Sequence, residues 1–125
     1  MTTSAMFLAI RTVAVPATNQ DRAKALFEDL GFEARFDAEL QPGFRWIELA
    51  PPDTTTSIAL VKSGEQLPTG IDTGIRLVTA DARLAHATLS ERGLSVGELL
   101  DWESASLMFS FCDDDGNRYY VSEPS

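Results

Sequence analysis

Aromatic and charged side chains that alternate with aliphatic ones are the residues of this chain best suited to chemistry. In the segment 44–50, Trp46 and Glu48 alternate with aliphatic residues, so an extended backbone would present the indole and the carboxylate on one face. A Trp beside a carboxylate suits an organic cation or a hydrogen-bonding aromatic ligand. It equally suits a half-exposed strand, and the sequence leaves both interpretations open.

A second set of polar and aromatic residues lies later in the chain. By period two, Arg118, Tyr120 and Ser122 share one face of an extended segment. Arg76 brings a fixed positive charge and a fork suited to a carboxylate or a planar pair of oxygens. A salt bridge between Arg76 and an acidic neighbour is the alternative. Trp102 falls in an expected loop, where a mobile aromatic ring can cover a pocket.

Several kinds of catalytic site lack the residues they need. The only histidine, His86, falls on the expected outer face of a helix, where we expect it to be solvated, and the only cysteine, Cys112, lies in an expected strand without a neighbouring base. No Ser-His-Asp or Cys-His arrangement is therefore expected. There is no GxGxxG or phosphate-binding loop. Glu48 and Tyr120 remain the candidates for metal-free acid–base chemistry.

Composition and charge narrow the class of protein. The 125 residues are 44% hydrophobic and 9% aromatic, which suits one domain or two small modules that share a core. Ten basic and 19 acidic residues give a net charge of −9, which repels phosphate backbones, so nucleic acid is not an expected partner. The acidic residues favour solubility and cationic partners.

The N-terminal part of the chain carries no membrane or export signal. The longest strongly apolar run, residues 5–10, is far too short to span a bilayer, and MTTSAMF lacks the basic start and cleavage site of a secretory signal. A lone cysteine agrees with a reducing compartment. We expect a cytoplasmic protein with no membrane partner.

The segment 10–32 reads as strand, cap, helix and stop. An apolar stripe at positions i, i+3, i+4 and i+7 predicts a helix over 20–30, with Asn19 as the N-cap. Gly31 can take the left-handed conformation after the last turn and so end the helix. A shift from Gly31 to Gly93, 62 residues on, repeats the pattern and carries Asn19 to Asp81. The agreement of cap, stripe and stop predicts an internal repeat.

The repeat predicts two β-α-β-β-β modules in a single α+β domain. The first module, 7–62, is expected to hold strands at 7–16, 32–40, 44–50 and 56–62 around the helix 20–30. The second, 73–123, is expected to hold strands at 73–79, 94–100, 106–112 and 117–122 around the helix 82–92. The segment 63–72, SGEQLPTGID, is the expected linker, and 113–117 is a charged turn rather than a calcium loop.

This tandem arrangement resembles the vicinal oxygen chelate superfamily, which includes glyoxalase I, extradiol dioxygenases, fosfomycin resistance enzymes and bleomycin resistance proteins. The resemblance rests on TVAVPATNQDRAKALFEDLGF, on DARLAHATLSERG and on CDDDGNRYYV, where the family usually reads DPDGN. It implies that each module curls a mixed sheet around a cup, and that two modules placed edge to edge complete one site.

The resemblance also implies where a metal would bind, and the sequence departs from it there. Metal-using members take His, His or Glu, and Glu from the first and last strands of the modules, whereas this chain has Thr12, Ala59, Gly74 and Tyr120 at the corresponding positions. Divalent iron, nickel and zinc prefer imidazole and carboxylate ligands. We therefore expect no metal ligands and no cofactor, with a divalent metal only if an atypical site exists.

The cup implied by the resemblance leads to expectations about the ligand site, the function and the oligomeric state. The strand faces that the resemblance places at the cup, together with the residue types noted above, predict that the following residues line a ligand site: Thr12, Trp46, Glu48, Arg76, Trp102, Arg118 and Tyr120. The function expected is binding of an amphipathic small molecule in the cup or in a dimer groove. The alternative is an enzyme of the same superfamily, a lyase, isomerase or dioxygenase, with an atypical metal site or metal-free acid–base chemistry. Unpaired sheet edges favour a homodimer, and the apolar residues 5–10 could help that contact.

Overall fold

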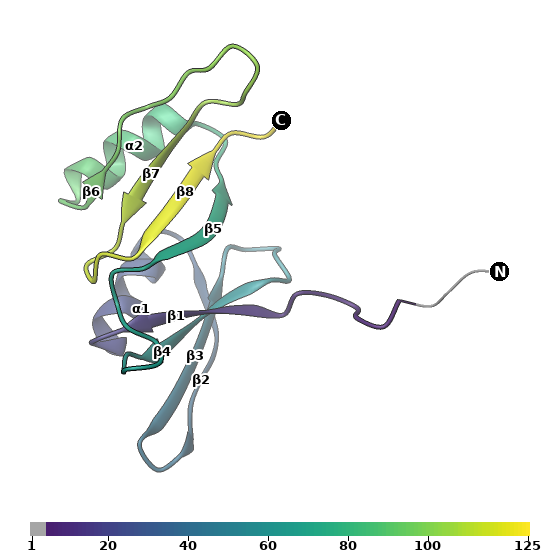
Figure 1. Cartoon of the computed structure of the whole chain (residues 1–125), viewed down its shortest axis with the longest axis vertical. Coiled ribbons are helices and arrows are strands. Elements are labelled where there is room, and N and C mark those ends of the chain that lie inside the picture. The colour runs from purple at the N-terminus through teal and green to yellow at the C-terminus, as the bar shows by residue number, and fades with distance from the viewer. Residues whose placement is uncertain (1–4) are drawn as a thin grey trace. The chain divides into compact units, whose positions relative to one another are not determined.

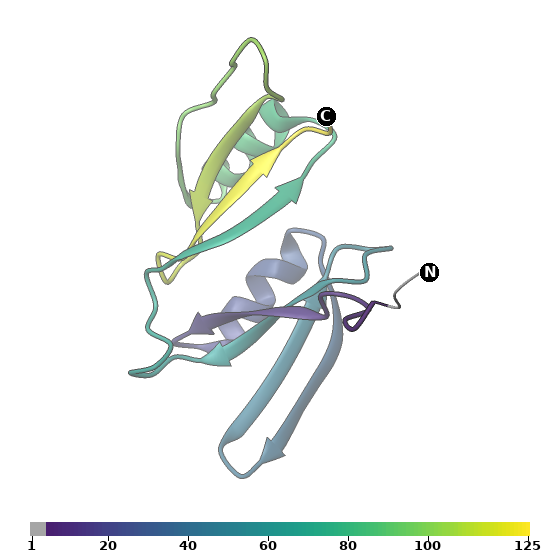
Figure 2. The ribbon, with the colours of Figure 1, turned by 45° about the vertical axis from the view of Figure 1, so that its right-hand side comes forward.

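The computed structural model describes residues 5–125, and the chain divides into two compact units, one ending at Gly64 and one beginning at Glu65. Each unit holds one helix and four strands in the order β-α-β-β-β. In Figure 1 and Figure 2 each helix lies along one face of its own sheet. The α+β fold class with two modules of the same kind is therefore confirmed.

The two units have the same topology. Unit 1 consists of β1 (Thr12–Ala17), α1 (Gln20–Asp29), β2 (Glu33–Gln41), β3 (Phe44–Ala50) and β4 (Ser57–Lys62). Unit 2 consists of β5 (Asp72–Val78), α2 (Ala82–Glu91), β6 (Ser95–Val96), β7 (Met108–Cys112) and β8 (Arg118–Ser122). The sheet orders are β1-β4-β3-β2 and β5-β8-β7-β6, and in each sheet the first strand pairs in parallel with the last. The repeat inferred from the sequence therefore appears in the structure as the same order of helix and strands along the chain and the same order of strands in each sheet.

Two predicted strands differ from those observed by more than two residues. The first begins at Thr12 rather than at residue 7, because its partner β4 begins only at Ser57 and the register of the two paired strands starts with Thr12 opposite Ser57. The predicted strand 94–100 is reduced to the two residues of β6, with one further bridge from Leu100 to Met108. At Gly97 the chain runs so close to β7 that a Cβ would lie 2.9 Å from Ser110 Oγ.

One face of each sheet packs on its helix. In unit 1, Leu26 and Phe27 of α1 are buried, as are the residues of the strand face that alternates with Trp46 and Glu48, namely Val15, Ile47, Leu49, Ile58 and Leu60. Gln20 Nε2 donates to the carbonyl oxygens of Arg45 and Leu60, both at 2.9 Å, and so ties the start of α1 to β3 and β4. The opposite face of the unit 1 sheet carries the polar and aromatic residues.

The two helices begin and end in the same way. The side chains of Asn19 and Asp81 each accept a hydrogen bond of 3.0 Å from the backbone N–H three residues later. After the last turns, Gly31 and Gly93 have φ of 100° and 88° and each donates its N–H to a carbonyl oxygen three residues back, at 3.0 Å. These are the N-caps and left-handed stops expected from the sequence.

We expect Gly31→Val and Gly93→Val each to lower the free energy of unfolding by about 1 kcal/mol or more, because a β-branched residue resists a positive φ. A Cβ at either position meets no heavy atom within 4 Å, so backbone strain alone should set the loss, and the two variants should behave alike. Urea titration measures both, and wild-type stability in either variant would show that the glycine is not needed to end its helix.

A charged cluster joins α1 to the β2–β3 hairpin of unit 1. Arg45 donates to both oxygens of Asp37 at 2.8 Å, and Lys24 Nζ lies 2.9 Å from Asp37 Oδ2. These hydrogen bonds, that from Arg45 above all, hold the pKa of Asp37 well below its usual range. A carboxyl whose pKa is lowered on folding stabilises the fold above its unfolded-state pKa, and that stabilisation is lost as the pH falls.

We therefore expect Asp37→Asn to lower the free energy of unfolding at pH 7 by about 1 kcal/mol. The difference from wild type should shrink as the pH falls below about 4, where unfolded-state Asp becomes protonated. Urea titrations at pH 7 and pH 3 test this, with Glu39→Gln on the same strand as the control for loss of an exposed charge. A difference that is the same at both pH values would contradict the assignment.

Within residues 5–125, no helix combines the length and the apolar character needed to cross a membrane.

Candidate functional site

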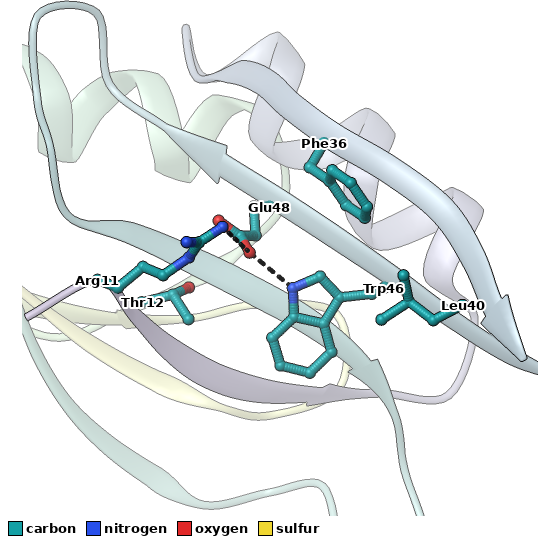
Figure 3. A pocket seen from close by; sticks show the side chains of 6 residues that line it. All are labelled: Arg11, Thr12, Phe36, Leu40, Trp46 and Glu48. Atoms are coloured by element: carbon teal, nitrogen blue, oxygen red, sulfur yellow. Dashed lines mark hydrogen bonds and ion pairs between the residues drawn. The ribbon is translucent and has the colours of Figure 1, made fainter.

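The face of the unit 1 sheet that points away from α1 is hollowed. A cavity of about 350 Å³ there is lined by six residues, shown in Figure 3: Arg11, Thr12, Phe36, Leu40, Trp46 and Glu48. The pairing of β2 with β3 sets Phe36 opposite Glu48, so the two strands present an aromatic ring and a carboxylate to the same space. The volume falls within the range of small-molecule pockets.

Glu48 is the polar centre of this cavity. Its side chain is only 12% exposed, and Trp46 Nε1 donates to Glu48 Oε2 at 2.7 Å. Ser57 Oγ lies 3.3 Å from Glu48 Oε1 and 2.8 Å from Thr12 Oγ1. Since the indole N–H is used by Glu48, Trp46 offers a ligand the face of its ring rather than a hydrogen-bond donor.

Arg11 reaches the same carboxylate from outside. Its Nη2 lies 3.8 Å from Glu48 Oε2, and its side chain is 83% exposed. Figure 3 shows the guanidinium and the Trp46 indole meeting Glu48 from different sides. Because the Arg11 guanidinium is in contact with solvent, its attraction to Glu48 at this distance is weakened by screening.

Apolar side chains complete the cavity and its rim. Phe36 and Leu40 of β2 are 41% and 52% exposed, and the ring of Phe44 lies 6.1 Å from that of Trp46, centroid to centroid. Large apolar groups that face solvent beside a few fixed polar groups are typical of small-molecule sites.

The open face of the unit 2 sheet carries a separate polar cluster. The guanidinium of Arg76 lies 4.2 Å from the centroid of the Tyr120 ring and donates to the carbonyl oxygen of Gly74 at 2.8 Å. The Tyr120 hydroxyl donates to Asp72 Oδ2 at 2.5 Å, which raises the pKa of Tyr120 and lowers that of Asp72. Tyr120 is thus a hydrogen-bonded phenol with a cation on its ring.

The predicted site residues fall into three groups. Thr12, Trp46 and Glu48 meet in the cavity of unit 1, and Arg76 and Tyr120 are in contact on unit 2. Arg118 shares a strand face with Tyr120, and strand pairing places it opposite Cys112. Trp102 lies in the loop between β6 and β7 of unit 2 and is 59% exposed.

Four residues that line the cavity or contact Glu48 were not predicted from the sequence, namely Arg11, Phe36, Leu40 and Ser57. The strand of Phe36 and Leu40 reads as a polar edge in the sequence. The register of β2 against β3 shifts between Ala34 and Phe36 and again between Glu39 and Gln41. These shifts determine which β2 side chains lie on the same face as Trp46 and Glu48. No local pattern predicts such shifts, so these side chains could not be assigned to the cavity beforehand.

The expectation that His86 is solvated on the outer face of its helix is wrong. His86 is half-buried, its Nε2 lies 2.8 Å from the carbonyl oxygen of Gly97, and its ring packs edge-on against Phe109 at 5.1 Å between centroids. The chain after β6 runs close to α2 and covers this position. A histidine held in this way serves packing and helix docking rather than metal binding.

The donor groups of the structure do not fit the family's metal site. The positions that correspond to its ligands supply one hydroxyl, from Thr12, and one phenol, from Tyr120, which is bonded to Asp72. Glu48 already accepts the Trp46 N–H and faces Arg11. Among residues 5–125, no three His, Cys, Asp or Glu side chains are grouped so that they could hold a metal ion. Iron, nickel and zinc prefer imidazole and carboxylate ligands that this set does not provide.

Comparison with known proteins identifies the fold family. No protein-family model matches the sequence, and no curated protein matches it. A member of the glyoxalase/bleomycin resistance protein/dioxygenase superfamily from Sphaerobacter thermophilus DSM 20745 is 29% identical to this chain. The match covers 96% of this chain and 100% of that protein, with a TM-score of 0.87. TnmS3, an antibiotic binding protein from Streptomyces sp. CB03234, is 29% identical over 98% of this chain and 100% of its own, with a TM-score of 0.84.

A further structure settles the membership. The glyoxalase/bleomycin resistance protein from Streptomyces sp. CB03234 is 31% identical, covers 89% of this chain and 96% of its own, and has a TM-score of 0.75. Its identity and coverage agree with the shared β-α-β-β-β modules described above. The chain therefore belongs to the glyoxalase/bleomycin resistance protein/dioxygenase superfamily, the group with the vicinal oxygen chelate fold.

Proposed function

We propose that this protein binds an amphipathic, aromatic small molecule and does not transform it. The observation that carries the proposal is the cavity of about 350 Å³ beside Trp46, in which exposed apolar side chains surround one fixed carboxylate. Apolar walls supply most of the affinity for a small ligand, and a few fixed polar groups orient it. The ligand enters the cup formed by a sheet face, or a groove between two copies of the chain.

The similarity to TnmS3 supports this choice of ligand class. TnmS3 is an antibiotic binding protein and is 29% identical to this chain over nearly its whole length. We propose that the present protein binds a compound of the same broad kind, an antibiotic-like molecule with an aromatic part, in a site that uses no metal. Sequestration of such a molecule requires affinity but no catalytic group.

A thermal-shift screen tests the proposal. The panel contains aromatic antibiotics and, as controls, aliphatic compounds of similar size. A ligand present at 100 times its dissociation constant stabilises the folded state by about 2.7 kcal/mol, so binding should raise the melting temperature by several degrees. The absence of any stabilising aromatic compound would overturn the proposal.

Two measurements separate binding from the enzymatic alternative. Mass spectrometry of a bound compound after overnight incubation should recover it unchanged. Metal analysis of protein purified without chelator should find no stoichiometric iron, zinc, nickel or manganese. A transformed ligand, or a metal whose removal abolishes an activity, would favour a lyase, isomerase or dioxygenase instead.

We also propose that the protein is a homodimer. Each unit leaves sheet edges, β1 and β2 in unit 1 and β5 and β6 in unit 2, and the apolar residues Met6, Phe7, Leu8 and Ile10 are between 70% and 93% exposed. Exposed apolar segments and open edges are commonly covered in an assembly. Light scattering at micromolar concentration should give the mass of two chains, and Leu8→Glu should weaken the association. A monomeric wild-type protein would contradict this.

A further inference from the structure

We infer that the unit 1 cavity selects aromatic ligands that carry a protonated amine or amidine. Glu48 binds the cation of the ligand. In the absence of ligand, Arg11 occupies the position of that cation, and the ligand displaces it. This inference rests on the proposed function, since it concerns the ligand of the same cavity. Beyond the proposed function, it assigns a positive charge to the ligand and names the residues that recognise this charge.

Glu48 is positioned before any ligand arrives. The Trp46 N–H holds one carboxylate oxygen at 2.7 Å, and the Ser57 hydroxyl lies 3.3 Å from the other. With only 12% of its side chain exposed, Glu48 has little freedom to turn away from the cavity. A carboxylate fixed in this way gives a cation a preformed partner at little entropic cost.

Arg11, in contrast, is held loosely. Its closest approach to Glu48 is 3.8 Å, well beyond the 2.7–2.9 Å of a strong charge-assisted hydrogen bond, and its side chain is 83% exposed. The backbone is anchored, because the carbonyl oxygen of Arg11 accepts the Ser57 N–H at 3.0 Å. The side chain can therefore leave Glu48 without disturbing β1, and a ligand cation can take its place.

The surroundings of Glu48 favour a cation over an anion. Aromatic ring faces attract cations, and the cavity presents the rings of Phe36 and Trp46. The indole N–H is already used by Glu48, so it is not available to an anionic group. The net charge of −9 further raises the local concentration of cationic ligands.

The test compares three probes that share an indole ring, namely tryptamine, tryptophol and indole-3-acetate, which are cationic, neutral and anionic at pH 7. Each is titrated into ¹⁵N-labelled full-length protein, and the Nε1–H signal of Trp46 is followed by NMR, with Trp102→Phe used to assign it. We expect tryptamine to bind at least about tenfold more tightly than tryptophol, and indole-3-acetate to bind most weakly.

Two variants at the cavity should act in opposite directions. Glu48→Gln should remove the preference for tryptamine over tryptophol, whereas Arg11→Gln should raise tryptamine affinity about two- to fivefold, because the competing cation is gone. Glu28→Gln on α1 and Arg83→Gln on α2 make the same charge changes outside the cavity and should leave the preference as it is. The dispersion of the amide spectrum verifies that each variant is folded.

The outcomes separate this inference from the proposed function. Equal binding of tryptamine and tryptophol, with the Trp46 signal shifted by both, would overturn the selection for cations and leave aromatic binding standing. Lower tryptamine affinity in Arg11→Gln would overturn the role of Arg11. If none of the three probes shifts the Trp46 signal, both the selection and the binding of aromatic ligands in this cavity are wrong.

Discussion

Asp113→Ala should lower the free energy of unfolding by about 3 kcal/mol, the largest loss expected from any single polar substitution considered for this chain. Asp113 opens the turn between β7 and β8, and its carbonyl oxygen accepts the Gly116 N–H at 3.0 Å. Its carboxylate accepts the Tyr119 hydroxyl at 2.8 Å and the Asn117 side-chain amide at 3.0 Å. Both of those partners have fully buried side chains.

The cost arises from the partners that the substitution leaves behind. Asn117 Oδ1 accepts the backbone N–H groups of Gly70 and Ile71, at 2.9 and 3.3 Å, so the turn also holds the chain that leads into β5. Burial, together with the neighbouring Asp113, raises the pKa of Tyr119, which keeps its hydroxyl a donor. A buried donor that loses its acceptor costs more than a surface hydrogen bond contributes.

Urea titration of Asp113→Ala beside Asp114→Ala measures this effect. Asp114 is the exposed neighbour in the same turn, so its replacement removes an equal charge without touching the buried hydroxyl and amide. The Asp114 variant should stay within about 0.5 kcal/mol of wild type. Equal losses in the two variants would show that charge, and not the buried network, determines the stability of this turn.

Trp46→Ala should weaken the affinity for an aromatic ligand by about 10- to 100-fold, which corresponds to about 1–3 kcal/mol. The substitution removes the ring face that borders the cavity and also the N–H that holds Glu48 at 2.7 Å. Both the contact surface and the position of the carboxylate are lost together. The ligand to use is whichever compound stabilises the protein most in the thermal-shift screen.

The titration belongs in a Trp102→Phe background, because Trp102 is exposed and would add its own fluorescence. Quenching of Trp46 reports binding to that parent protein, and calorimetry compares the parent with its Trp46→Ala derivative. Trp46→Phe is the matched control, since it keeps a ring but not the N–H, and it should fall between the two. Equal affinity in all three proteins would place the ligand elsewhere.

The helices and their repeat follow from residue type and spacing alone. Asn19 and Asp81 cap backbone amides three residues away, and Gly31 and Gly93 take positive φ after the last turns. These interactions span only a few residues, so residue type and spacing suffice to predict them. The same applies to the alternation that puts Trp46 and Glu48 on one face of β3, since it follows from the geometry of a strand.

The start of each strand and the residues that surround Glu48 depend instead on long-range strand pairing. β1 starts at Thr12 because β4 starts at Ser57, and these partners are far apart in the sequence. Phe36 faces the cavity because the pairing of β2 with β3 shifts next to Arg35, and a one-residue shift exchanges the two faces of a strand. Strand pairing is a long-range interaction that local patterns do not encode. Alternation along one strand therefore predicts that Trp46 lies beside Glu48, but it does not predict that Arg11, Phe36 and Ser57 surround them.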